Sequence, residues 1–143
     1  MPADGRIALE ALSEATFAPF GKLIRFSPEP EDERFEVVIE EPEAPWRVAV
    51  FRVRQHAAAR MEAHPSSMET FEPVGGTGVL LVAAPDAPGD VRAFLLDTPV
   101  CLRKGIWHEA IALSAEALYK ITENACVDSI FYPLDHTMSF WVG

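Results

Sequence analysis

The sequence predicts an all-β domain of the jelly-roll type that carries a short N-terminal helix. The chain has 143 residues and is 49% hydrophobic, which is enough for one core without disulfide or metal staples. Short segments of strand-type composition recur at spacings of about 8–12 residues, as in sandwiches and barrels. The sequence shows neither strand–helix alternation nor a repeat of about 30 residues, which argues against parallel α/β and solenoid folds. We therefore expect residues 1–143 to form a single domain.

The predicted helix begins near the N-terminus. Ser13 is a favourable N-cap and Glu14 is an acid in the first turn, where it complements the helix dipole. Pro19 and Gly21 should end the helix.

Strand signals dominate after this helix. Proline or glycine separates most of the expected strands, which are 47–54, 79–84, 91–96, 100–103, 106–113, 117–121 and 127–132. In the first of them, Ala49, Phe51 and Val53 share one face. The segment 79–84 is apolar on both faces, so we expect it to be buried on both sides.

The charge balance excludes some partners. Twelve Lys and Arg against 22 Asp and Glu give a net charge of −10, which is a poor match for nucleic-acid phosphates or anionic lipid. The acid excess is concentrated between Pro28 and Pro45, where Arg34 is the only base, and it predicts a solvated loop. The rest of the chain is close to neutral, so a small anionic substrate is compatible with it.

Targeting and redox signals are also missing from the sequence. The longest apolar run, 79–85, is far shorter than the roughly 20 residues that a membrane helix needs. The N-terminal stretch has acids among its apolar residues and does not resemble a signal peptide. Cys101 and Cys126 form no disulfide framework and no C-x-x-C pair. We expect a cytoplasmic protein with no membrane partner.

The segment 61–76 contains the first group of chemically active side chains. Glu62 and His64 lie two residues apart, so a strand places them on the same face. Glu69 has the wrong parity for an unbroken strand, and the turn-forming residues 65–67 can reset the phase. Gly75 and Gly76 predict a hairpin turn into the following apolar strand.

The second group lies on a strand after a glycine turn. His108 follows Gly105 and shares a face with Ile106 and Ala110. On a regular strand, Glu109 and Trp107 lie on the opposite face, so we expect Glu109 to point away from His108.

Together these segments resemble the two motifs of the cupin superfamily. The first motif ends in His, then Glu, then Gly, and His64, Glu69 and Gly76 match it, with Glu62 in place of the first His. The second motif is P-x-G-x-x-H, which Gly105 and His108 match, with an arginine in place of the proline. The resemblance implies a double-stranded β-helix, the cupin form of the jelly roll.

Within the cupins, the chain is similar to the ureidoglycolate lyase family over roughly residues 12–113. The shared segments are Phe17–Gly21, the E-x-H-P at Glu62–Pro65, Phe71–Pro73, Arg92–Phe94 and Gly105–His108. The chain departs from the family at Glu69, where Gln is usual, at Glu109, where a second His is usual, and at Thr122–Glu123, where the family has Asp-Arg.

The resemblance implies a carbon–nitrogen lyase of allantoin and purine breakdown, which splits ureidoglycolate into glyoxylate and urea. It implies Glu69, His108 and Lys104 as catalytic residues, and Arg92, Lys104 and Trp107 as binding residues for a small anionic organic acid. Arginine can hold a carboxylate with two hydrogen bonds. Cupins commonly pair through a sheet edge, so a homodimer is expected.

A metal ion is the expected cofactor. Glu62, His64, Glu69 and His108 form a mixed nitrogen and oxygen set that suits Mn, Fe, Ni or Zn. As ligands of one centre, the two histidines should bring their ring nitrogens within about 6 Å of each other. A metal-free mechanism stays open, because the family often has Gln at the position of Glu69, and Glu69 or Glu62 would then be the base.

Two alternative functions remain. One is another metal-dependent cupin enzyme that acts on a different small organic acid, an alternative favoured by Glu69 and Glu109. The other is a cupin that binds a small ligand without turnover.

Overall fold

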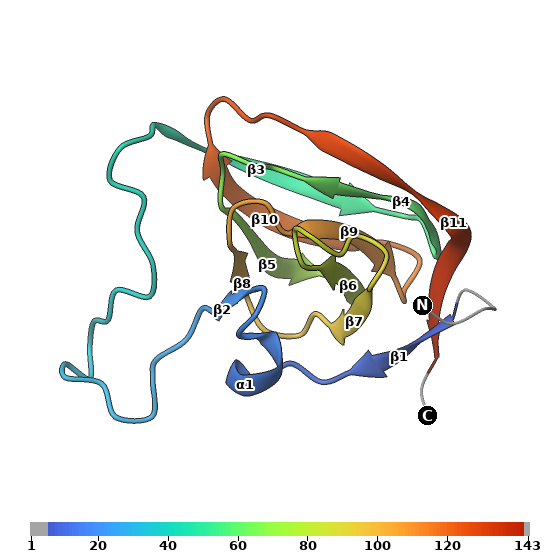
Figure 1. Ribbon diagram of the computed structural model, residues 1–143. Helices are drawn as coiled ribbons and strands as arrows, with labels where there is room; N and C mark the ends of the chain where they lie inside the picture. Colours follow the sequence, from blue (N-terminus) through green and yellow to red (C-terminus); the bar gives the residue numbers. More distant parts are fainter. Residues whose placement is uncertain (1–5, 142–143) are drawn as a thin grey trace.

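The computed structural model describes residues 6–141, and the side chains of residues 6–135. This part of the chain forms one short helix and eleven strands, so the predicted all-β class with an N-terminal helix is confirmed (Figure 1). None of its helices is long and apolar enough to cross a membrane. The elements are β1 (Arg6–Glu10), α1 (Glu14–Phe17), β2 (Gly21–Leu23), β3 (Trp46–Val53), β4 (Ala58–Ala63), β5 (Glu69–Gly75), β6 (Gly78–Ala83), β7 (Arg92–Leu95), β8 (Val100–Leu102), β9 (Trp107–Ala112), β10 (Ala117–Asn124) and β11 (Ile130–Trp141).

Helix α1 is a single turn that starts as the sequence predicts. The Ser13 hydroxyl accepts a hydrogen bond from the backbone N–H of Thr16 at 3.1 Å, as an N-cap does. Phe17 at its end is fully buried and packs edge-on against Phe94 of β7. The helix therefore covers one end of the core.

The strands form two layers. Six of them close into a barrel in the order β1-β11-β4-β9-β6-β7, and five form a sheet in the order β2-β8-β5-β10-β3. Strands that follow each other in the chain often lie in different layers, as in a jelly roll. The site described below is built from both layers.

Gly75 and Gly76, at the end of β5, make a turn, but not the expected hairpin. Gly76 has φ +70°, and a Cβ there would lie 2.0 Å from the carbonyl oxygen of Glu116, so only glycine fits. However, β5 pairs with β8 and β10, whereas β6 pairs with β7 and β9. The turn carries the chain from the sheet into the barrel.

Strand β6 is buried on both faces, as its apolar run predicts. Leu80 and Val82 belong to the main core, which includes side chains of both layers, such as Phe71 and Tyr119. The alternate residues, such as Leu81, belong to a second core built from barrel strands. The two cores fix the position of β9, which is the neighbour of β6 and carries His108.

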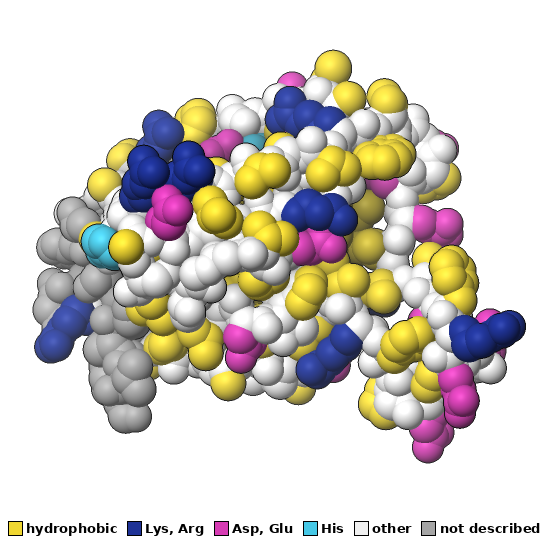
Figure 2. Space-filling view, turned by 180° about the vertical axis from the view of Figure 1, so that it is seen from behind, with side chains coloured by type: hydrophobic (Ala, Val, Ile, Leu, Met, Phe, Trp, Pro, Cys, Tyr) yellow, Lys and Arg dark blue, Asp and Glu magenta, His cyan; other side chains and the backbone are white. Residues whose placement is uncertain are grey.

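The acidic segment has no helix or strand, in agreement with the loop prediction. Residues 24–45 project from the body, and acidic side chains are visible on the projecting part (Figures 1 and 2). The segment is attached at a few polar contacts, such as Lys22 Nζ to the Val38 carbonyl at 3.4 Å and Lys104 Nζ to Glu41 Oε2 at 2.9 Å.

Candidate active site

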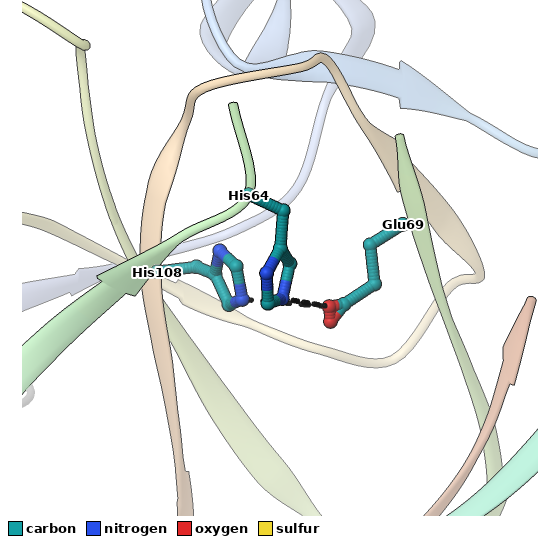
Figure 3. A group of neighbouring side chains, drawn as sticks. All are labelled: His64, Glu69 and His108. Carbon is teal, nitrogen blue, oxygen red and sulfur yellow. Dashed lines mark ion pairs between the residues drawn. The ribbon is translucent and has the colours of Figure 1, made fainter. Parts of the chain in front are cut away.

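Three buried side chains meet between the two layers. His64 follows the end of β4, Glu69 begins β5 and His108 lies in β9, and they are 7%, 7% and 6% exposed. The two imidazole centroids are 5.0 Å apart. Glu69 Oε2 lies 3.2 Å from His64 Nε2 and 3.4 Å from His108 Nε2 (Figure 3). The structure thus brings together three of the four predicted metal ligands.

A turn between β4 and β5 lets residues of opposite parity face the same space. The His64 carbonyl accepts hydrogen bonds from the N–H of Ser67 at 3.4 Å and of Gly105 at 3.0 Å. The Ser67 hydroxyl accepts one from the N–H of Asn124 in β10 at 3.0 Å. These bonds tie the turn to the β8–β9 connection and to β10, so that Glu69 enters β5 facing the histidines.

The outer nitrogens of both histidines are held by backbone carbonyls. His64 Nδ1 lies 3.1 Å from the Asp128 oxygen, and His108 Nδ1 lies 3.0 Å from the Ile106 oxygen. A carbonyl only accepts, so each Nδ1 carries a proton and donates it. In the neutral imidazole, Nε2 then presents a lone pair. Two lone pairs and a carboxylate that face each other need protons or a cation between them.

The electrostatics of the three groups reflect this arrangement. Burial lowers the pKa of His64, but the contact with Glu69 and its charge outweigh burial and raise this pKa to about 9. Burial raises the pKa of Glu69, but its contacts with His108 and His64 lower it to about 2. The pKa of His108 is also raised, because Glu69 outweighs the effect of burial. Without a cation, the Glu69 carboxylate therefore favours the protonated form of both imidazoles.

The same three residues fit a divalent metal ion. Glu69 Oε2 is buried and has no hydrogen-bond partner among the described residues. One nitrogen or oxygen atom from each residue can serve as a ligand, and these atoms lie within 4.8 Å of one another. The hydrogen bonds at Nδ1 fix the rings in the orientation that metal-binding histidines usually have. Two histidines and one carboxylate form a set known from mononuclear metal enzymes with open positions for substrate.

The fourth predicted ligand, Glu62, lies beside this group. Its Oε1 is 3.6 Å from His64 Nε2, and its side chain is 32% exposed. Glu62 is also paired with His108 across β4 and β9. Its carboxylate is therefore close enough to act on a molecule bound at the buried group.

The group opens into a cavity of about 310 Å³. Glu109 lines this cavity, although strand alternation predicts that it points away from His108. Burial raises the pKa of Glu109. The cavity is lined by Arg47, Ala49, Val50, Phe51, Glu62, His64, Glu69, Phe71, His108, Glu109, Ala110, Ile121, Glu123, Val127 and Ser129.

Three residues predicted to bind substrate do not line this cavity. Arg92 lies on β7 and pairs with Glu10 of β1, with Nη2 2.7 Å from Oε1. Lys104 faces the acidic segment and pairs with Glu41. Trp107 is adjacent to His108 but on the opposite face of β9, and its indole N–H donates to the Pro85 carbonyl at 3.1 Å. The structure does not bring these side chains together with His108.

Comparison with known proteins identifies the family. The family model described as ureidoglycolate lyase matches residues 36–133, which is more than half of the chain. The chain belongs to this family. The match begins after the segment Phe17–Gly21 and continues past residue 113, so it lies further along the chain than the resemblance read from the sequence.

Comparison with solved structures gives partial matches at low sequence identity. RmlC from Streptococcus suis in complex with dTDP-D-xylose has 16% identity and a TM-score of 0.47, over 57% of this chain and 45% of that one. Bacillus subtilis oxalate decarboxylase, in a study of its Mn(II) centres, has 17% identity and a TM-score of 0.48, over 64% of this chain and 24% of that one. The chain thus spans less than half of either protein. No curated protein sequence matches it.

Proposed function

We propose that the protein is a ureidoglycolate lyase that releases glyoxylate and urea. The match to the ureidoglycolate lyase family over residues 36–133 carries this proposal. The buried His64–Glu69–His108 group supports it, because it opens into a cavity large enough for a small organic acid.

The reaction breaks the bond between a carbinol carbon and a urea nitrogen. A base must take the proton of the hydroxyl group, and an acid must give a proton to the departing nitrogen. Glu62 is partly exposed beside the buried group and is the better-placed base. Glu69 holds the two imidazoles, and His108 can donate a proton because its pKa is raised. The sequence also predicts Lys104 as a catalytic residue. Lys104 pairs with Glu41 and does not line this cavity.

We also propose that the site binds Mn, Fe, Ni or Zn. His64, Glu69 and His108 would hold the ion, with Glu62 as the fourth ligand. A bound metal would lower the pKa of the substrate hydroxyl and so help its deprotonation. In the metal-free alternative, the raised pKa of both histidines favours positive charge next to the substrate.

Products distinguish this lyase from other enzymes. Incubated with racemic ureidoglycolate, the protein should release urea and glyoxylate in equal amounts, since a single bond is broken. Both products are measured with coupled assays, with and without added divalent metal, against the spontaneous breakdown. A hydrolase acting on the ureido group would release ammonia instead.

Absence of urea above the background in every metal condition would contradict the lyase assignment. The favoured alternative is then another cupin enzyme that acts on a different small organic acid, because Glu69 supplies a carboxylate where the family usually has an amide. Binding of small acids without any turnover would indicate the non-catalytic alternative.

We further propose a homodimer formed through strand β3, in a protein of the cytoplasm. Among the described strands β3 pairs only with β10, so one edge of it is open. Its residues Trp46 and Val48 do not line the cavity and are 69% and 51% exposed, an apolar strip that a second copy of the same strand can cover. Sedimentation should give twice the chain mass of 15.8 kDa, and Val48→Glu should shift it towards the monomer. A wild-type monomer at micromolar concentration would contradict this proposal.

A further inference from the structure

Arg47 is the only Lys or Arg among the described residues that line the active-site cavity. The other ionisable side chains there are four carboxylates and two histidines, namely Glu62, Glu69, Glu109, Glu123, His64 and His108. A carboxylate substrate would be repelled by these acids unless a fixed cation faced it. The cations expected from the sequence, Arg92 and Lys104, are paired elsewhere.

The sheet register places Arg47 in line with the buried group. Glu69 of β5 is paired with Glu123 of β10, and Glu123 is paired with Arg47 of β3. Paired residues on neighbouring strands project from the same face and lie about 5 Å apart. Glu69, Glu123 and Arg47 therefore form one row across the inner face of the sheet. Arg47 stands two strands away from Glu69, which is within reach of a molecule that also contacts the histidines.

The ion pair with Glu123 orients the guanidinium and leaves donors free. Arg47 Nε and Nη2 both donate to Glu123 Oε2, at 3.0 and 2.6 Å. The Glu123 side chain is 8% exposed, whereas that of Arg47 is 50% exposed. Within the described residues no hydrogen bond uses Nη1 of Arg47, so its donors remain available to a ligand.

We infer that Arg47 binds the carboxylate of the substrate and that Glu123 is the residue that positions it. The inference rests on the proposed function, because it assumes an anionic organic acid in this cavity. It assigns the carboxylate contact to β3, which belongs to the other layer than the β4–β9 pair that carries Glu62 and His108. The hydroxyl and ureido groups of the substrate would then face these two side chains.

Binding of one charged and one neutral probe tests this role of Arg47 without any turnover. Glycolate is a small 2-hydroxy acid, and glycolamide is its uncharged amide. Wild-type protein should bind glycolate, and Arg47→Ala should weaken that binding about 10- to 100-fold, the usual scale for a charge-assisted hydrogen bond. Glycolamide should bind both proteins equally. Arg52→Ala is the matched control, since Arg52 lies on the same strand but pairs with Glu116 outside the cavity.

The possible results separate this inference from the lyase assignment. Equal glycolate binding by wild type and Arg47→Ala, or no glycolate binding by wild type, would overturn the role of Arg47. Glycolate binding that depends on Arg47 in a protein that releases no urea would retain the role and refute the lyase activity. In an active enzyme, Arg47→Ala should raise KM for ureidoglycolate with a smaller effect on kcat. A melting temperature close to that of Arg52→Ala would show that the fold is intact.

Discussion

Replacing His108 by alanine should lower kcat/KM for ureidoglycolate by about 100-fold or more, the scale expected when an acid–base group or a metal ligand is lost. The His108 side chain is buried, its Nδ1 is held by the Ile106 carbonyl, and its Nε2 points at Glu69. Its removal therefore takes away a proton donor and one of the nitrogens that surround the carboxylate. Initial rates of urea release over a range of substrate concentrations give the two kinetic constants.

His56→Ala is the matched control for this variant. His56 also has its Nδ1 within 2.8 Å of a backbone carbonyl of β9, that of Ala112, but it is exposed and does not line the cavity. It should keep wild-type kinetics. His108→Gln, which retains volume and polarity, guards against a loss of activity caused only by a packing defect. An active His108→Ala enzyme would remove His108 from the mechanism.

The parts of the fold that sequence patterns could predict are those determined locally. The apolar run of β6 and the cap at Ser13 were readable, because burial and capping depend on neighbouring residues. Strands β1 and β2 were not predicted, and β11 continues well beyond the expected end at residue 132. β1 is held by parallel pairing with β11 and β7, which are far away in the sequence. Local composition does not contain that information.

The residues of the site also fall into those that local sequence patterns predict and those that depend on pairing between distant strands. His64, Glu69 and His108 were found because they match two short motifs, and the spacing within a short motif is readable from the sequence. The ion pair of Arg47 and Glu123 joins residues 76 positions apart and depends on the β3–β10 register. Arg92 and Lys104 were assigned from the family pattern. Their partners, Glu10 and Glu41, lie in segments whose position against the rest of the fold cannot be read from local sequence patterns.

Replacing Glu69 by glutamine should weaken metal binding, by an amount that grows with pH. In the metal-free protein, Glu69 raises the pKa of His64 to about 9, so a metal ion must displace a proton from His64 below this pH. The wild-type affinity should therefore rise with pH up to about 9. If His64 had the ordinary histidine pKa of about 6.5, the metal affinity would stop rising at a much lower pH.

The glutamine variant lacks both the carboxylate ligand and the charge that holds the proton on His64. Its affinity should level off nearer the ordinary pKa of histidine and be lower than that of wild type by about 10- to 100-fold or more at high pH. At neutral pH, His64 loses its proton more easily in the variant than in wild type, and this offsets part of the loss of affinity. The ratio of the wild-type affinity to that of the variant should therefore increase between pH 7 and pH 9. The upper limit follows from the raised pKa of His64, which is about 9 in wild type. Titration of Mn²⁺ and Zn²⁺ against a competing chelator at several pH values measures this ratio.

Glu72→Gln is the control, because Glu72 lies on the same strand but pairs with Lys120 and does not line the cavity. Equal metal affinities for wild type and Glu69→Gln across the pH range would mean that Glu69 is not a ligand and would favour the metal-free mechanism.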